Sequence, residues 1–506
     1  MSGTAGAGTE FHTPKGRVRG RRTDDGGVAV LGIPYGAPPF GPYRFRAPRP
    51  AASWSGTRDC GDFGPISPQS ARLPGAPVWR PGDEDVLTLN VWAGPGTAAG
   101  GARPVLVWVH GGAYTFGSPA QPDFDGAALA RAGLVVVSVG HRVGFEGFGH
   151  VPGFPDNRGL LDLVAALRWV QDGIAAFGGD PGRVTVAGQS SGAGSAVCLM
   201  AMEEARGLFH RVVAHSVPSA FYVPEVAAAI TSAVAAEAGV AATADGLLSA
   251  APERLVAASD GVAARCREGG PVAAVQAYNP VVYQPVVDGE VLPATPLDAL
   301  GAGAAREVDL LVCHTLEECW FLHRVGAIRD VTSEEELGAF ARAFGLPAAL
   351  PDAYRELMPG APVRDRYLAL FGDAQFGEYS SRLAEQHVRA GGRAHLSRFA
   401  RRRQVEGGPT RPWHTADVPF AFANLDAEGA DFLLGAAPDA ADRALSSRMV
   451  RAWADFAATG DPGWPALTEG ATPVHHWAVP EDRVTDDRGS ARRALWRGVG
   501  FGPIRR

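Results

Sequence analysis

The feature that most constrains this chain is an apolar strand that ends directly in a Gly-x-Ser-x-Gly motif. The β-branched run that begins at Val184 ends at Gly188, and Gln189-Ser190-Ser191-Gly192 follows before an apolar stretch typical of a buried helix. A strand that turns at once into a helix strains the backbone of the middle residue and leaves its side chain at the tip. The two glycines lie where the strand and helix backbones nearly touch. Ser190 is therefore the candidate nucleophile.

The motif alone is weak evidence, because glycine makes up 65 of the 506 residues, so its surroundings must support it. Val105 to Val109 is an unbroken apolar run, typical of a strand buried on both faces, and Leu134 to Val139 repeats the pattern. Between Asn157 and Phe177, apolar residues recur at helical spacing. Buried strands that alternate with helices predict an α/β fold, with a mostly parallel central sheet and helices on both faces.

Further segments complete the predicted sheet. Short strand-like pieces between Gly16 and Asp59 precede a strand that alternates from Val86 to Trp92. Arg211 to Ser216 predicts the strand after the Ser190 turn, and Gly391 to Arg403 is expected to contain the final strand. Leu445 to Ala458 predicts a C-terminal helix.

Composition favours a soluble enzyme. The net charge of −7 argues against nucleic acid or an anionic membrane as the main partner. No apolar run of about 18 residues is present, so no membrane span is expected, and Met1 to Glu10 does not resemble a signal peptide. The five cysteines are scattered and odd in number, which suggests free thiols in a reducing compartment. We therefore expect a cytoplasmic protein, whose oligomeric state the sequence does not specify.

Five longer motifs, spread over most of the chain, are more specific than the Ser190 motif. They are Gly32-Ile33-Pro34-Tyr35, Glu84-Asp85-x-Leu87-Thr88-Leu89-Asn90-Val91-Trp92, Phe177-Gly178-Gly179-Asp180-Pro181, Pro285-Val286-Val287-Asp288-Gly289 and Trp453-Ala454-Asp455-Phe456-Ala457-x-Thr459-Gly460-Asp461-Pro462. With them, the sequence resembles the type-B carboxylesterase family, the cholinesterase-like branch of the α/β-hydrolases. The resemblance implies one α/β-hydrolase catalytic domain over residues 1–506. It also implies helical, cap-like segments around 219–305 and 323–390, although helices merely packed over the sheet edge remain an equal alternative.

The resemblance also implies the partners of Ser190. His414 precedes Asp417-Val418-Pro419-Phe420-Ala421-Phe422, as the family's catalytic histidine precedes an acid and Pro-Phe-x-Phe. For the acid that orients this base, placing Thr315 on the family's Asn/Thr position makes Glu318 catalytic. A shift of one residue would select Glu317 instead. Because Cys313 and Cys319 depart from the family pattern, both glutamates stay open, with Glu318 preferred.

The loop after the first buried strand, His110-Gly111-Gly112-Ala113, predicts an oxyanion hole. We expect its donors to be the backbone N–H groups of Gly112, Ala113 and Ser191. Ala113 stands where many relatives have a third glycine, which leaves the backbone donor in place. In the family, such a loop goes with the acceptance of esters of tertiary alcohols.

Other positions are expected to be structural. Arg44 and Glu84 resemble the family's buried ion pair, and Ser216 resembles a serine that lies behind the base. His110 is expected to form a wall of the pocket. Three more histidines at strand ends are expected to line or pack: His141, His215 and His314. Val86 and Ser67 occupy the positions of a disulfide found in secreted relatives, so that bridge is absent.

The sequence therefore predicts a serine hydrolase that cleaves small carboxylic esters through an acyl-enzyme on Ser190, with His414 as base and Glu318 as its orienting acid. No metal or organic cofactor is implied. An amidase or acyltransferase could use the same residues. A non-catalytic binding protein, which some relatives have become, is disfavoured by the intact Ser190 and His414. The physiological ester cannot be read from the sequence.

Overall fold

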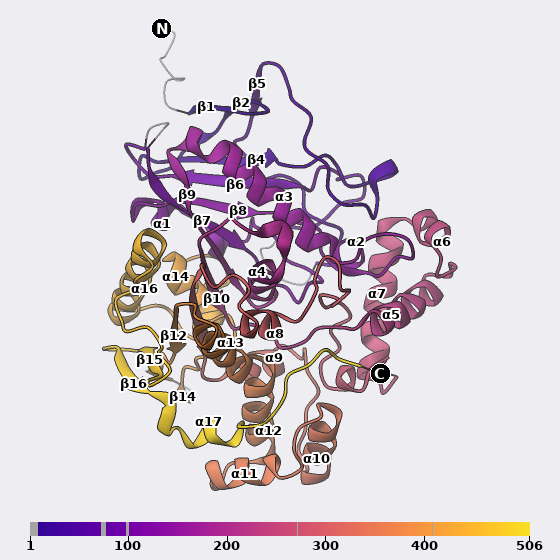
Figure 1. Ribbon diagram of the computed structural model, residues 1–506, viewed down its shortest axis with the longest axis vertical. Helices are drawn as coiled ribbons and strands as arrows, with labels where there is room; N and C mark the ends of the chain where they lie inside the picture. The colour runs from indigo at the N-terminus through magenta and orange to yellow at the C-terminus, as the bar shows by residue number, and fades with distance from the viewer. Residues whose placement is uncertain (1–8, 72–76, 98–100, 271, 407, 506) are drawn as a thin grey trace.

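One large twisted sheet forms the centre of the protein (Figure 1). The computed structural model describes residues 9–71, 77–97, 101–270, 272–406 and 408–505. Within these residues the sheet has 11 strands, and their order across it differs from their order in the sequence. From one edge to the other they are β16 (Arg483–Asp486), β15 (Pro473–Trp477), β12 (Ala394–Phe399), β11 (Asp309–Thr315), β10 (Arg211–His215), β9 (Gly179–Gln189), β7 (Arg103–Val109), β8 (Val135–Val139), β6 (Thr88–Ala93), β4 (Val28–Pro34) and β3 (Arg21–Arg22).

The middle of the sheet is parallel and its two ends are antiparallel. From β15 through β8, every neighbouring pair of strands is parallel. β16 at one edge and β6, β4 and β3 at the other run antiparallel to their neighbours. A mostly parallel sheet was predicted from the apolar runs, and this prediction is confirmed.

The prediction that Gly391 to Arg403 contains the final strand is wrong. It contains β12, but β15 and β16 extend the sheet beyond it. The physical reason is visible in the residues of β15, Pro473-Val474-His475-His476-Trp477, which lack the continuous aliphatic run of a central strand. All four residues of β16 are exposed, so it carries no burial pattern.

Helices cover both faces of the sheet. In β7, Val105, Val107 and Val109 belong to one hydrophobic core, whereas Leu106 and Trp108 belong to another on the opposite face. The first core contains α3 (Arg158–Gly173) and α4 (Ser191–Ala201), and the second contains α1 (Ala127–Arg131), α14 (Val418–Phe422) and α16 (Ala440–Thr459). The predicted helices at 157–177 and 445–458 correspond to α3 and α16.

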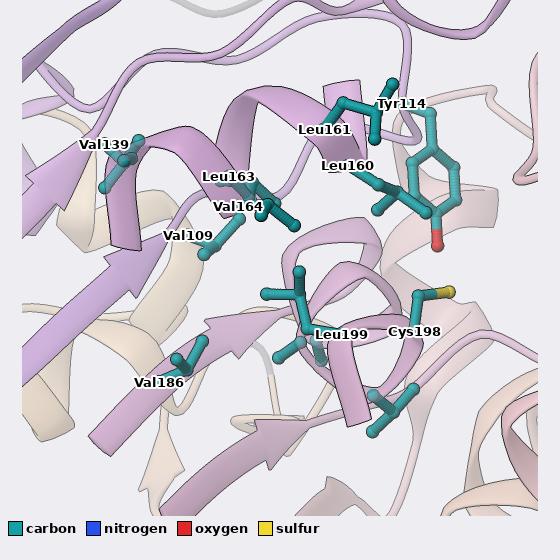
Figure 2. Packing of buried hydrophobic residues seen from close by; sticks show 14 of the residues in the cluster. Val109, Tyr114, Val139, Leu160, Leu161, Leu163, Val164, Val186, Cys198 and Leu199 are labelled. Atoms are coloured by element: carbon teal, nitrogen blue, oxygen red, sulfur yellow. The ribbon is translucent and has the colours of Figure 1, made fainter. Parts of the chain in front are cut away.

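Figure 2 shows part of the first core, with side chains from β7, β9, α3 and α4. Val109 of β7 and Val186 of β9 lie near Val164 of α3 and Leu199 of α4, and all four side chains are buried. Burying a Val or Leu side chain stabilises a fold by about 1.5–3 kcal/mol. This packing fixes α4, and with it the turn that carries Ser190, against the strand ends.

Helices make up most of the two segments predicted to be cap-like. Between residues 219 and 305 they are α5 (Pro224–Glu237), α6 (Ala244–Ser249), α7 (Pro252–Arg267) and α8 (Pro296–Gly301). Between 323 and 390 they are α10 (Glu334–Ala343), α11 (Leu350–Leu357), α12 (Val363–Gly372) and α13 (Glu378–Arg389). In Figure 1, α5 to α7 lie together at one side of the sheet and α10 to α12 at the bottom. That the whole chain forms one domain stays a prediction.

Smaller elements complete the described chain. A separate three-stranded sheet is formed by β1 (Glu10–Thr13), β2 (Gly16–Arg19) and β5 (Thr57–Asp59), and a two-stranded one by β13 (Gln404–Val405) and β14 (Gly408–Pro409). The remaining α-helices are α2 (Gly144–Phe148), α9 (Glu318–Arg324), α15 (Ala430–Leu434) and α17 (Ala491–Leu495). No helix among the described residues is both long and apolar enough to cross a membrane. The segment from Met1 to Glu10 does not resemble a signal peptide in sequence, and its residues 1–8 lie outside the described residues.

All five cysteines are buried and free. A cytoplasmic location stays a prediction.

The predicted ion pair between Arg44 and Glu84 is not formed. Arg44 is buried and its Nη2 lies 2.6 Å from Oε1 of Glu146 in α2, while Glu84 is exposed. The Arg44 guanidinium also donates to the backbone carbonyl of Ala250, which ties the N-terminal layer to the loop before α7. The motif around Glu84 describes only neighbouring residues. It does not show which carboxylate approaches the buried guanidinium in the folded chain.

Glu146→Gln should lower the free energy of unfolding by about 3–5 kcal/mol, because it leaves the buried Arg44 charge without a counter-charge. Glu84→Gln, the matched control at an exposed position, should change it by less than about 0.5 kcal/mol. Urea unfolding followed by far-UV circular dichroism measures both. Equal effects of the two substitutions would contradict the importance of the Arg44–Glu146 pair.

Candidate active site

Ser190 lies on a strained turn between two regular elements. β9 ends at Gln189, α4 begins at Ser191, and Ser190 between them has φ 56° and ψ −127°. A Cβ at Gly188 would lie 2.4 Å from the carbonyl carbon of Gly192, and one at Gly192 would lie 2.1 Å from the backbone oxygen of Val109. These separations are impossible for real atoms, so both glycines of the motif are required for the turn.

Glu318 and His414 meet behind the turn. Glu318, the first residue of α9, places Oε2 2.5 Å from Nδ1 of His414. Its other oxygen, Oε1, accepts hydrogen bonds from the Ser216 hydroxyl at 2.6 Å and the Thr315 backbone N–H at 2.7 Å. Ser216 therefore lies behind the acid rather than directly beside the base. With both oxygens occupied, the Glu318 carboxylate is fixed in orientation.

Glu317 makes different contacts. Its carboxylate forms ion pairs with Arg402 at 2.9 Å and Arg411 at 3.0 Å, both on the molecular surface. The two glutamates that the motif left open therefore make different contacts. Glu318 lies against the imidazole of His414, and Glu317 does not.

The second nitrogen of His414 faces Gln189. Gln189 Nε2 lies 3.1 Å from His414 Nε2, and the Phe376 ring lies over the imidazole with its centroid 4.5 Å away. Because Nδ1 faces a carboxylate, it carries the proton, and Nε2 is left as an acceptor for the Gln189 amide. The sequence reading missed both residues. Gln189 could have been found, since it directly precedes Ser190 on the strand.

Ser190 and His414 open into one cavity of about 660 Å³. Ala113 and Ser191 line it at the turn, and some of the residues between 259 and 267 and between 279 and 284 line it as well. Residues 325–327 and 375–376 also contribute to the lining. Residues of both helical segments therefore line this cavity, and a cap-like role for the two segments stays a prediction.

The backbone N–H groups of Gly112, Ala113 and Ser191 have no acceptor among the described residues. Ala113 has φ 53° and Gly112 φ 125°, and a Cβ at Gly112 would lie 1.9 Å from the backbone oxygen of Phe116. The loop thus needs glycine at 112 but tolerates alanine at 113. Free N–H groups beside the cavity suit the stabilisation of a developing oxyanion.

Comparison with known proteins agrees with this geometry. Residues 7–482 match the model of the carboxylesterase family. The chain belongs to the carboxylesterase family. It is 33% identical over 491 residues to the para-nitrobenzyl esterase of Bacillus subtilis, covering 94% of each chain. It is 34% identical to the phenmedipham hydrolase of Pseudarthrobacter oxydans, covering 89% of this chain and 90% of that one.

A solved carboxylesterase of Geobacillus stearothermophilus superposes on this family member with a TM-score of 0.83, at 33% identity. The match covers 96% of this chain and all of the other. The predicted α/β-hydrolase fold is therefore confirmed, and the protein is a carboxylic ester hydrolase.

Other histidines of this carboxylesterase lie away from the cavity. His110 does not line it, contrary to the prediction, because its ring stacks on that of His141 with centroids 4.6 Å apart. Burial lowers the pKa of His110 to about 3 and of His141 to about 4, so both are neutral near pH 7. His314 is also buried, which lowers its pKa well below the usual value. All three are packing residues.

One buried group of this carboxylesterase has the composition of a metal site. His215, Cys313 and Asp417 lie within reach of one another at the ends of β10 and β11 and in the loop before α14. However, Nδ1 of His215 is only 2.5 Å from Oδ2 of Asp417, which is hydrogen-bond spacing. This contact occupies only one of the two carboxylate oxygens, because Oδ1 of Asp417 is buried and has no hydrogen-bond partner among the described residues.

Proposed function

We propose that the protein hydrolyses carboxylic esters through an acyl-enzyme on Ser190. The single observation that carries this proposal is the contact of 2.5 Å between Glu318 and His414, made where His414 and Ser190 share one cavity. A carboxylate at Nδ1 fixes the tautomer in which Nε2 can accept a proton. Ser190, at the tip of the turn, is the nucleophile that this base serves.

The chemistry follows from these positions. Ser190 Oγ attacks the ester carbonyl carbon as its proton moves to Nε2 of His414, and the carbonyl oxygen gains negative charge. The N–H groups of Gly112, Ala113 and Ser191 stabilise that charge, each contributing about 10²–10³ in rate. When the tetrahedral intermediate collapses, the C–O bond to the alcohol breaks and His414 returns the proton to the alcohol. Water then attacks the acyl-enzyme by the same steps and releases the acid.

The proton transfer requires one rearrangement. In the resting geometry Nε2 of His414 accepts the Gln189 amide, so this hydrogen bond must yield when the imidazole takes the Ser190 proton. The imidazolium then carries an Nε2–H, which the amide oxygen of Gln189 can accept after the side chain rotates. The Gln189 side chain therefore lies beside Nε2 of His414, the atom that takes up and returns the proton.

A small ester is the expected substrate, since the cavity of about 660 Å³ has the size of a small-molecule site. One relative acts, by its name, on para-nitrobenzyl esters, so a para-nitrobenzyl ester is a reasonable first substrate. No cofactor takes part in the proposed steps. The lack of a nucleic-acid partner stays a prediction, and the sequence does not specify the oligomeric state.

The proposal is tested by comparing esters with matched amides. Purified protein should hydrolyse para-nitrobenzyl and n-butyl butanoates and should react covalently with a fluorophosphonate, losing activity in proportion to labelling. Hydrolysis of the amides at rates equal to those of the esters would favour the amidase alternative. Transfer of the acyl group to added alcohol with no release of acid would favour the acyltransferase.

A tert-butyl ester should be hydrolysed measurably, although more slowly than its n-butyl isomer. The cavity wall at Ala113 carries only a methyl side chain, and the adjacent Gly112 carries none, which leaves space for a branched alcohol next to the oxyanion donors. Gas chromatography of released tert-butanol measures the rate. Good turnover of the n-butyl ester with none of the tert-butyl ester would contradict this expectation.

A further inference from the structure

His215 is a buried histidine that the proposed reaction does not use, although it lies at a strand end that contacts two of the catalytic elements. It is the last residue of β10. Its backbone carbonyl accepts the N–H of Ser190 at 2.9 Å. The hydroxyl of the next residue, Ser216, donates to Glu318 at 2.6 Å. The end of β10 therefore holds both the Ser190 turn and the orienting acid, whereas His414 lies on a separate loop.

The side chain of His215 reaches the loop that carries His414. Nδ1 of His215 lies 2.5 Å from Oδ2 of Asp417, which follows His414 by three residues, and the two side chains of this pair are 2% and 0% exposed. The Trp453 ring meets the imidazole of His215 edge to face, with centroids 5.0 Å apart, which fixes the plane of the imidazole. Because Nδ1 faces a carboxylate, it carries a proton and donates a hydrogen bond to Asp417.

The carboxylate of Asp417 has no other hydrogen-bond donor among the described residues. Asp417 directly precedes α14, a place where aspartate commonly caps a helix, but its side chain accepts no capping hydrogen bond. Its second oxygen, Oδ1, is buried and has no partner in the described part of the chain. A buried carboxylate is costly when it lacks a donor, so the bond from His215 decides where this side chain lies.

The loop between His414 and Asp417 contains a strained residue. Thr415 has φ 70°, a left-handed conformation that β-branched residues rarely adopt and that persists only where the surroundings hold it. The backbone N–H of His414 is 3.4 Å from the carbonyl of Glu318, longer than an ordinary hydrogen bond. Beyond His414, the charge-assisted bond from His215 to Asp417 therefore ties the loop to the sheet.

We propose that His215 is a positioning residue, which through Asp417 holds the loop of His414 in place for catalysis. The inference rests on the proposed esterase function and adds a residue that touches neither the substrate nor the reacting atoms. His215 does not line the cavity. A misplacement of about 1 Å far from the chemistry can cost about 10² in rate, so a loop that loses this tie should slow the reaction without weakening substrate binding.

The third member of this buried group, Cys313, does not turn the pair into a metal site. In a tetrahedral zinc site, ligand atoms held about 2.0–2.2 Å from the ion lie about 3.4 Å from each other. Nδ1 of His215 and Oδ2 of Asp417 are 2.5 Å apart. Structural zinc sites also have four ligands, and this group offers three. The geometry is that of a hydrogen bond.

His215→Leu and His215→Gln test the proposal together, with n-butyl butanoate as the substrate. Leucine has no donor, whereas glutamine keeps a side-chain N–H that can donate to Asp417. At equal folded fraction, judged by thermal unfolding, kcat of His215→Leu should fall about 10²-fold while KM stays within about twofold. His215→Gln should bring kcat back to within about fivefold of the wild type. An unchanged kcat in His215→Leu, or no recovery in His215→Gln, would overturn the proposal and leave the esterase function intact. A wild type that hydrolyses no ester would refute the esterase function itself.

His395→Leu is the matched control, because it makes the same change at another buried histidine two strands away, in β12. Nδ1 of His395 lies 3.0 Å from the carbonyl of Trp464, and neither residue contacts a catalytic group in the described chain. This variant should unfold at a lower temperature than the wild type, but its kcat at equal folded fraction should stay within about twofold. A loss of kcat as large as in His215→Leu would show a general effect of buried histidines and would overturn the positioning role.

Two further measurements cover the case in which His215→Leu does not fold. Asp417→Asn keeps the shape of the side chain but replaces a charge-assisted bond with a weaker neutral one, so kcat should fall about threefold to tenfold at unchanged KM. An unchanged kcat would overturn the proposal. Elemental analysis of the purified wild type should find no bound zinc. About one zinc per chain, lost in Cys313→Ala, would make His215 and Asp417 metal ligands and would also overturn it.

Discussion

Ser190→Ala should lower kcat by about 10⁶, because it removes the atom that forms the acyl-enzyme and leaves only binding and the oxyanion donors. The backbone at position 190, with φ 56°, admits alanine about as well as serine, so the fold should be kept. Rates are measured on the best ester of the panel. Fluorophosphonate labelling, read by intact-protein mass spectrometry, should disappear in the same variant.

Ser191→Ala is the matched control for this substitution. Ser191 is the adjacent serine and also lines the cavity, but the proposal gives a role only to its backbone N–H, which alanine keeps. Its kcat should stay within about tenfold of the wild type. Continued labelling of Ser190→Ala, or a loss in Ser191→Ala as large as in Ser190→Ala, would move the nucleophile away from Ser190.

Strands were predicted best from the sequence where burial on both faces makes the run of apolar residues continuous. β7 and β8 are buried on both faces, so their valine-rich runs predicted them directly. The turn at Ser190 was predictable for a different reason, since the backbones at Gly188 and Gly192 approach too closely for any side chain. The edge strand β16 was missed because all four of its residues are exposed, and β15 beside it was missed because its His-His-Trp segment lacks the continuous aliphatic run of a central strand.

Contacts between distant segments were predicted less well. Arg44 was assigned to Glu84 from a motif, but Glu146 reaches it, and nothing local in either segment distinguishes the two carboxylates. The contact of Gln189 with His414 joins residues 225 positions apart.

The choice between the two adjacent glutamates leads to the second large effect. Glu318→Gln should lower kcat by about 10⁴, because an amide at Oε2 no longer holds the His414 tautomer whose Nε2 accepts the Ser190 proton. The substitution also changes the side chain that accepts hydrogen bonds from the Ser216 hydroxyl and from the Thr315 backbone N–H. KM should change much less than kcat, since Glu318 does not line the cavity.

Glu317→Gln isolates this effect, because it makes the same chemical change one residue away. Glu317 pairs with Arg402 and Arg411, whose side chains are substantially exposed, and pairs of this kind contribute about 0–1 kcal/mol to stability. Its kcat should therefore stay within about threefold of the wild type. Both variants are compared at equal folded fraction, judged by thermal unfolding. If Glu317→Gln lost about 10⁴ in kcat while Glu318→Gln kept its activity, the orienting acid would be Glu317, and the short contact between Glu318 and His414 would have only a structural role.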